Sequence, residues 1–138
     1  MSQQNVDLVR KAYEAFGRGD IPAVLEAFDP NIEWVSPVGQ YRLGGVYKGP
    51  DAIATNFFMV LGEIWETLDV TPQELIDGGD RVIVFGNAIG KARATGTTVK
   101  TPYVHCHTVK NGKVARFEEF LDTATINKAT MPVGSTVS

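Results

Sequence analysis

The chain has 138 residues, 43% of them apolar and 21% charged, so we expect one compact domain over residues 1–138. Its net charge of −3 and its 13 scattered basic residues exclude the basic stripe that a nucleic-acid-binding protein needs. The sequence contains no run approaching the ~20 apolar residues of a membrane span, and no signal-peptide pattern at its start. We therefore expect no nucleic-acid partner, no membrane partner and a cytoplasmic location.

Three helices are predicted in the N-terminal half. Apolar residues recur at helical spacing within residues 4–17 and again within residues 51–64. Between these segments, Asp20 has the side chain of a helix N-cap, and Pro22 is tolerated in the first turn of a short helix at residues 20–28.

The remaining segments have the composition and turn signals of β-structure. A strand is expected to start at Asn31, in the alternating segment NIEWVSP, and a short one at Val46–Tyr47. From Trp65 onward the chain is rich in β-branched residues and is interrupted by the turn sequences DGGD, ATGT and KNGK. Four further strands are predicted at residues 66–77, 80–93, 97–110 and 113–121. Helices followed by such a meander predict an α+β fold, and residues 130–138 are expected to form a disordered tail.

Both histidines of the chain lie in the last predicted hairpin, one residue apart. Its turn, Asn111-Gly112, is the strongest short hairpin signal, because a type I′ turn needs positive φ at both central residues. With Lys110 opposite Lys113, the expected cross-strand pairs are His107–Arg116, His105–Glu118, Tyr103–Phe120 and Thr101–Asp122. These side chains share one face because strand side chains alternate. The other face is expected to hold Val104, Cys106, Phe117, Glu119 and Leu121.

A facing His105–Glu118 pair is suited to proton transfer near neutral pH, because a carboxylate raises the pKa of a neighbouring imidazole. The alternative is a solvated face with a cross-strand salt bridge, and a register slip of one residue would separate the group. A metal site is another alternative, with Glu118 or Asp122 joining His105 and His107 as ligands. Because Arg116 opposite His107 would repel a cation, we predict no metal.

Three segments resemble the nuclear transport factor 2-like superfamily, close to its SnoaL-like and ketosteroid-isomerase-like branches. They are VRKAYEAFGRGDIPAVLEAFDPNIEWVSPVG, GVYKGPDAIATNFF and HTVKNGKVARFEEFLDTA, and their order and spacing extend over residues 5–126. The resemblance implies a cone-shaped α+β fold, in which three N-terminal helices pack on a strongly curved antiparallel sheet around a deep apolar pocket. It also implies a homodimer, for which the outer face of the meander is the expected contact.

The catalytic residues of ketosteroid isomerases do not transfer to this chain. Where those enzymes have DPVG, with the aspartate as general base, this chain has SPVG, with Ser36. Ala12 stands at the place of their oxyanion-donating tyrosine, with Tyr13 one residue further on. Val104 or His105 stands at the place of their protonated aspartate. The resemblance therefore does not imply steroid isomerisation by that mechanism.

The similarity to SnoaL-like cyclases implies a catalytic aspartate near the end of the last strand, where Asp122 stands. A polar residue of the preceding strand would join it, where His105 stands, and Trp34 would line the pocket. From residue types alone, the alternatives are an N-cap role for Asp122 at a short terminal helix, and core packing for Trp34 and Tyr13.

Two functions remain open. The first is a cofactor-free enzyme of isomerase, dehydratase or cyclase type, acting on a small apolar carbonyl or hydroxyl compound through His105, Asp122 and Glu118. The second is a non-catalytic protein that binds a small ligand or serves as a dimeric accessory module. The expected ligand-binding residues are Tyr13, Phe16, Trp34, Phe57, Tyr103, His107 and Phe120.

Overall fold

The structure is a computed structural model that describes residues 2–132 and 134. In chain order, its helices and strands are α1 (Ser2–Gly17), α2 (Ile21–Glu26), β1 (Phe28–Ser36), β2 (Gly45–Lys48), α3 (Pro50–Ile53), η1 (Ala54–Phe58), α4 (Met59–Ile64), β3 (Trp65–Gly78), β4 (Arg81–Ala92), β5 (Thr98–Lys110), β6 (Lys113–Leu121) and α5 (Thr123–Thr130).

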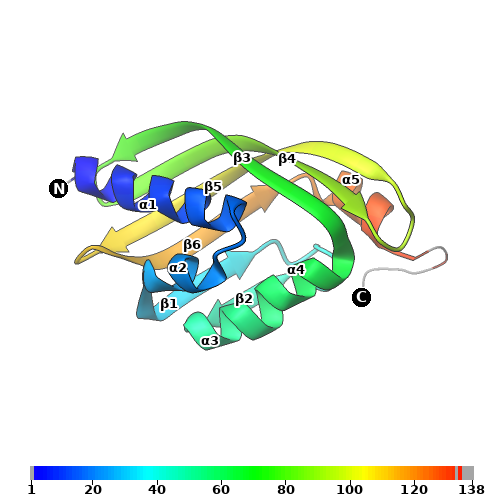
Figure 1. The fold of residues 1–138 in the computed structure, drawn as a ribbon, viewed down its shortest axis with the longest axis horizontal. Helices are drawn as coiled ribbons and strands as arrows, with labels where there is room; N and C mark the ends of the chain where they lie inside the picture. The colour runs from blue at the N-terminus through cyan, green and yellow to red at the C-terminus, as the bar shows by residue number, and fades with distance from the viewer. Residues whose placement is uncertain (1, 133, 135–138) are drawn as a thin grey trace.

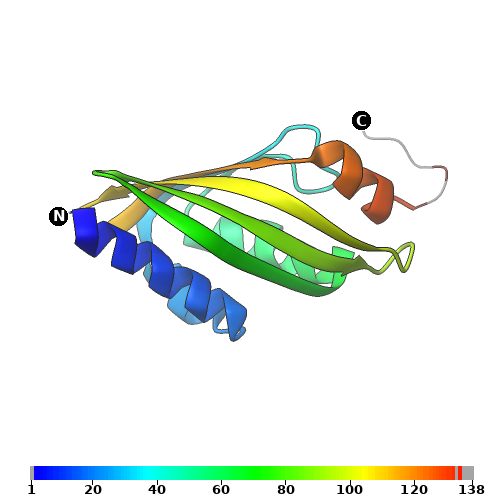
Figure 2. The same cartoon turned by 90° about the horizontal axis from the view of Figure 1, so that it is seen from above.

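One curved sheet organises the fold. Its strand order is β2-β1-β6-β5-β4-β3, with β1 parallel to β6 and the other neighbours antiparallel. Figures 1 and 2 show α1 lying along the long strands β3 to β5, with α2 beside it and α3 and α4 near β1 and β2. The predicted α+β class and the meander from β3 to β6 are confirmed.

Two glycines of β4 give room to aromatic side chains on the inner face of the sheet. A Cβ atom at Gly90 would lie 2.6 Å from the Trp65 ring, and one at Gly86 would lie 2.4 Å from the Tyr103 hydroxyl. Because real Cβ atoms do not approach other atoms so closely, both positions require glycine. The backbone of β4 and these two rings therefore pack directly against each other.

The helix predicted at residues 51–64 is found at residues 50–64, but its middle is not α-helical. Residues 54–58 form a π-helical turn, which inserts an extra residue into the helix. As a consequence, the adjacent residues Phe57 and Phe58 both reach the interior, where each ring contacts Trp34.

The other two helices follow their sequence signals closely. Val6, Val9 and Ala15 form the buried stripe of α1. The Asp20 carboxylate caps α2 by accepting a hydrogen bond from the Ala23 amide at 3.1 Å. The second helix is shorter than predicted, because β1 begins at Phe28 rather than Asn31.

A short helix precedes the predicted C-terminal tail. Helix α5 reaches Thr130, which is buried and donates its hydroxyl to the Ile126 carbonyl at 2.8 Å. Helix α5 thus ends where the predicted tail of residues 130–138 begins. Residues 133 and 135–138 of that prediction lie outside the described residues.

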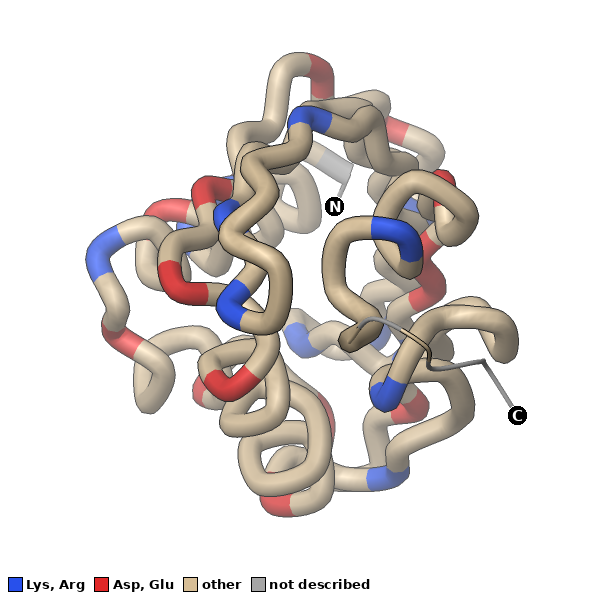
Figure 3. Tube along the Cα trace, turned by 90° about the vertical axis from the view of Figure 1, so that its right-hand side faces the viewer, with Lys and Arg blue, Asp and Glu red and all other residues tan. Residues whose placement is uncertain are grey.

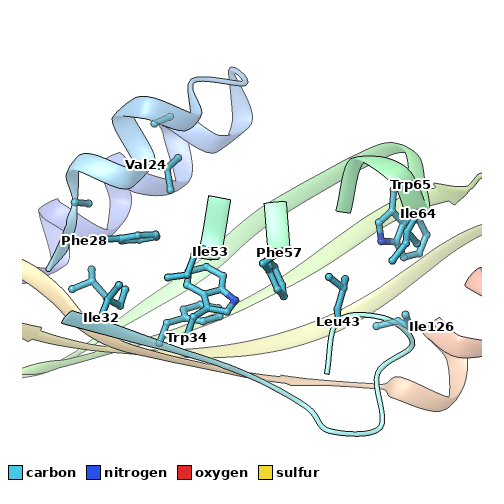
Figure 4. Packing of buried hydrophobic residues seen from close by; sticks show 14 of the residues in the cluster. Val24, Phe28, Ile32, Trp34, Leu43, Ile53, Phe57, Ile64, Trp65 and Ile126 are labelled. Atoms are coloured by element: carbon cyan, nitrogen blue, oxygen red, sulfur yellow. The ribbon is translucent and has the colours of Figure 1, made fainter. Parts of the chain in front are cut away.

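An aromatic cluster fills the space between β1, β6 and the helix at residues 50–64. Trp34 stacks on Phe117 with a centroid distance of 3.7 Å, and Phe57 and Phe28 approach Trp34 at 5.2 and 5.6 Å. Figure 4 shows Trp34, Phe57 and Phe28 pointing toward one another from β1 and the neighbouring helix. This cluster forms the floor of the site described below.

Acidic and basic residues are interspersed around the chain trace (Figure 3). None of the helices among the described residues combines the length and the apolar content that a membrane span requires.

Candidate functional site

The hairpin of β5 and β6 has the predicted turn but not the predicted register. Asn111 and Gly112 both have positive φ, at 51° and 74°, and Lys110 lies opposite Lys113. The ladder then shifts, because Val109 pairs with Val114 whereas Thr108 pairs with Arg116. One extra residue, at position 115, is thus accommodated in β6 as a β-bulge.

This bulge reverses the face of every β6 residue that follows it. His105 lies opposite Glu119, so the predicted His105–Glu118 pair is wrong. Glu118 lies opposite Cys106 and contacts Arg116, with 3.4 Å between Oε1 and Nε. The predicted ligand-binding residue Phe120 is also turned outward, with 57% of its surface exposed.

Asp122 caps a helix, as the alternative interpretation had it. Its Oδ1 accepts a hydrogen bond from the Thr125 amide at 3.1 Å, and its Oδ2 accepts one from the Thr125 hydroxyl at 2.7 Å. These two hydrogen bonds lower the pKa of Asp122, and its carboxylate is exposed. This placement separates Asp122 from the histidines and gives no support to its predicted catalytic role.

The two histidines meet the first helix through a single hydroxyl. The Tyr13 Oη atom lies 2.5 Å from His105 Nδ1 and 2.9 Å from His107 Nε2. Because a phenol has one proton, Tyr13 donates to one imidazole and accepts from an N–H of the other. Tyr103 stacks on the His105 ring at a centroid distance of 4.0 Å, which fixes the ring plane.

Burial keeps both imidazoles neutral. It lowers the pKa of His107 to about 3, and burial together with the neighbouring His107 lowers the pKa of His105 well below its usual range. The pKa of His105 is thus lowered, whereas a facing carboxylate was expected to raise it. Since the facing Glu119 carboxyl is itself largely protonated below pH 7, it supplies little negative charge to His105 there.

Glu119 is the buried acid of the site. Its Oε2 lies 3.7 Å from His105 Nε2, and its Oε1 lies 2.6 Å from the hydroxyl of the fully buried Ser36. Burial raises the pKa of Glu119 to about 7, while the Ser36 hydrogen bond acts in the opposite direction. A carboxyl with such a pKa exchanges its proton near neutral pH.

These polar groups open onto a mostly apolar cavity of about 130 Å³, comparable to the ~150 Å³ cavity that admits a benzene ring. Its polar wall comes from α1, β5 and β6, and its apolar wall comes from the aromatic cluster. The predicted residues among its lining are Tyr13, Phe16, Trp34, Phe57, Tyr103, His105 and His107. Glu118, Phe120 and Asp122 are not among the lining residues.

Sequence reasoning missed Glu119, which was assigned to the opposite face. A signal was nevertheless present, because Phe117 and Leu121 flank Glu119 at spacing two and share its side of the strand. An acidic residue within such an apolar alternation is a candidate buried carboxyl. Within the described part of the chain, no group of three or more possible ligands could hold a metal ion.

Comparison with known proteins defines the family. The profile of the SnoaL-like domain matches residues 9–117. The chain belongs to the SnoaL-like family. An uncharacterised protein of Mycobacterium tuberculosis strain H37Rv is 28% identical to this SnoaL-like protein over 116 residues, which cover 84% of this chain and 87% of the relative.

The chain is also similar to several solved structures. A nuclear transport factor 2-like protein of unknown function from Burkholderia pseudomallei K96243 has a TM-score of 0.88 and 32% identity, covering 93% of this chain and 98% of the other. TerC, co-crystallised with polyporic acid, has a TM-score of 0.85 and 32% identity, covering 92% and 98%. A putative SnoaL-like polyketide cyclase from Jannaschia sp. CCS1, at 24% identity and a TM-score of 0.78, shares the fold.

Proposed function

We propose that this SnoaL-like protein is a cofactor-independent enzyme that moves a proton on a small, mainly apolar carbonyl or hydroxyl compound. The observation that carries the proposal is a buried carboxyl, Glu119, whose pKa is raised to about 7 at the edge of an apolar cavity. A residue with such a pKa is an efficient base when ionised and an efficient acid when protonated.

In this proposal, ionised Glu119 removes a proton from the carbon next to a substrate carbonyl, and the electron pair moves onto the carbonyl oxygen. In a substrate with a β,γ double bond, the electron pair extends to the γ-carbon, and returning the proton there gives an isomerase. Delivering it to a β-hydroxyl, which then leaves as water, gives a dehydratase. His105, held neutral and oriented by Tyr13 and Tyr103, donates a hydrogen bond to the substrate oxygen in this proposal.

The cavity limits the substrate class. Its lining is dominated by aromatic and aliphatic side chains, and its volume of about 130 Å³ favours a compact, ring-sized reacting group. The similar protein TerC was co-crystallised with polyporic acid, which makes that compound a first ligand for binding measurements.

The test is proton exchange in heavy water. Purified protein is incubated with a panel of aryl and cyclic ketones, and deuterium incorporation next to the carbonyl is measured by NMR. We expect Glu119→Gln to slow the exchange by ~10²–10⁴-fold, which is the usual contribution of a positioned base. Glu118→Gln, a matched change on the opposite face of the same strand, should stay within a few-fold of the wild type.

A non-catalytic binding protein would give a different result. Ketones or polyporic acid would then raise the melting temperature, but the wild-type protein would not accelerate exchange above the buffer rate. That combination would replace the enzyme proposal by the ligand-binding one.

A further inference from the structure

The hydroxyl of Ser36 lies between two oxygen atoms that are both acceptors in their usual states. Ser36 Oγ is 2.6 Å from Gln40 Oε1 and 2.6 Å from Glu119 Oε1, and all three residues are buried. A serine hydroxyl has one proton, so it donates to one of these neighbours at a time. The other short contact therefore requires a proton on the neighbouring group.

Each protonation state of Glu119 has an arrangement that satisfies this proton count. When Glu119 is protonated, its carboxylic acid donates to Ser36 Oγ, and Ser36 donates to Gln40 Oε1. When Glu119 is ionised, Ser36 donates to Glu119 Oε1, and the Gln40 amide must present an N–H to Ser36 Oγ. The side-chain amide oxygen and nitrogen are nearly equal in size, so the amide can turn over within the same space.

The backbone around Gln40 is fixed, which restricts any movement to the side chain. The backbone N–H of Gln40 donates to the backbone carbonyl of Pro37 at 3.0 Å, and the backbone N–H of Gly44 donates to the backbone carbonyl of Gln40 at 3.0 Å. A Cβ atom at Gly44 would lie 2.4 Å from the Val38 carbonyl oxygen, so this turn is tightly packed.

We propose that Ser36 and Gln40 form a relay that follows the proton of Glu119, in which the Gln40 side-chain amide turns over when Glu119 ionises. Ser36 and Gln40 are thus positioning residues, which give the carboxyl a hydrogen-bond partner in both protonation states. Their importance for catalysis rests on the proposed function, whereas the relay itself can be tested without a substrate.

The other groups facing Glu119 do not take part in this titration. They are Tyr13 from α1, Tyr47 from β2, and Tyr103, His105 and His107 from β5. Burial raises the pKa of each of the three tyrosines and lowers the pKa of both imidazoles, so these side chains stay neutral around pH 7. Around pH 7 the relay therefore responds to the ionisation of Glu119.

The test is an NMR pH titration of the labelled full-length chain. The carboxyl carbon of Glu119, assigned through its loss in Glu119→Gln, reports ionisation, and the side-chain amide signals of Gln40 report the relay. We expect the Gln40 amide signals to shift with the same midpoint as the Glu119 carboxyl. Gln73 is the internal control, since its exposed amide oxygen accepts a hydrogen bond from Asn87 and should not follow this midpoint.

Ser36→Ala should uncouple the two signals. The Gln40 side-chain amide should then no longer follow Glu119, and the acid ionisation constant of Glu119 should fall by about tenfold, because the lost hydrogen bond is stronger to the charged form than to the neutral form. If Ser36→Ala does not fold, Ser36→Thr keeps the hydroxyl and should retain the common midpoint. Gln40 signals that stay constant through the ionisation of Glu119 would overturn the relay.

Gln40→Glu provides a second variant. An ionised carboxylate at this position accepts hydrogen bonds only, so it should hold the Ser36 proton and keep Glu119 protonated to higher pH. The double variant with Ser36→Ala separates this effect from direct repulsion between the two charges. If Gln40→Glu shifts the titration midpoint of Glu119 equally with and without the Ser36 hydroxyl, the relay is overturned.

The relay and the proposed enzyme can fail separately. If Gln40 and Glu119 titrate with a common midpoint but the protein exchanges protons on no ketone, the relay stands and only the enzyme proposal is contradicted.

Discussion

His105 on β5 lies directly opposite Glu119 on β6, with 3.7 Å between His105 Nε2 and Glu119 Oε2. The imidazole is neutral and the carboxyl exchanges its proton near pH 7, so neither is a permanent charge in the cavity. The pair therefore differs from a surface salt bridge, in which both partners remain ionised. When Glu119 ionises beside the neutral His105, its carboxylate is a buried charge without an ionised partner, and burial therefore raises the pKa of Glu119.

Glu119 should make the stability of the protein depend on pH. Its pKa rises from 4.5 to about 7 on folding, so its stabilising contribution is complete below about pH 4.5 and is lost as the pH rises through 7. Relative to Glu119→Gln, the wild type should lose on the order of 3 kcal/mol of unfolding free energy across this range. Urea denaturation of both proteins at several pH values measures this difference, in which the histidine contributions cancel.

The matched variant Glu118→Gln should show no such trend relative to the wild type. A constant difference between wild type and Glu119→Gln across the same pH range would contradict the raised pKa.

Tyr13→Phe should destabilise the protein by removing the hydroxyl that bridges the two imidazoles. His105 Nδ1 and His107 Nε2 would both lose their partner, at a cost of about 1–3 kcal/mol in unfolding free energy. Tyr47→Phe is the comparison, since it removes one hydrogen bond to the Leu43 carbonyl from a half-buried ring and should cost less. Equal losses in the two variants would show that the bridge has no special role.

Asp122 should affect stability rather than turnover. Asp122→Ala removes the N-cap of α5 and should lower the unfolding free energy by about 1 kcal/mol, whereas Asp122→Asn keeps an accepting oxygen and should cost little. On any ketone that the wild type exchanges, both variants should retain activity within a few-fold. A loss of activity by ~10²-fold in Asp122→Asn would restore the catalytic role expected from the resemblance.

The expected homodimer has a specific candidate contact on the outer face of the sheet. Phe85, Val104 and Phe120 are neighbours across β4, β5 and β6, and Phe85 and Phe120 are 41% and 57% exposed. We expect light scattering to give twice the chain mass of 15.0 kDa, and Phe120→Asp to give the monomer. Val38→Asp, a change at an exposed residue in a loop, is the control and should stay dimeric. A monomeric wild type would end this proposal.

Local sequence patterns were sufficient to predict the helices and the meander. The stripe of α1, the cap at Asp20 and the turn at Asn111-Gly112 each depend on neighbouring residues, and each is found where predicted. The π-turn in the helix at residues 50–64 was not predictable in this way, since it depends on the packing of Phe57 and Phe58 against Trp34.

The bulge in β6 explains most of the errors in the predicted site. Val114 and Phe117 are both buried although they stand three residues apart, which a regular strand does not allow. The broken alternation in VARFEEFL is thus a local sign of the bulge. By contrast, the burial of Glu119 and its contact with Ser36 depend on β1, which lies 83 residues away in the sequence. Such a contact could not be inferred from the hairpin alone.

The pH dependence of proton exchange tests the role of Glu119 most directly. On a responsive ketone, the wild-type exchange rate should rise with pH to a plateau, with a midpoint near the Glu119 pKa of about 7, because the ionised carboxyl is the base. Glu118→Gln should keep both the midpoint and the plateau. In Glu119→Gln the exchange rate at the plateau should be lower by ~10²-fold or more, while the protein remains folded. An unchanged profile in Glu119→Gln would contradict the assignment of Glu119 as the group that moves the proton.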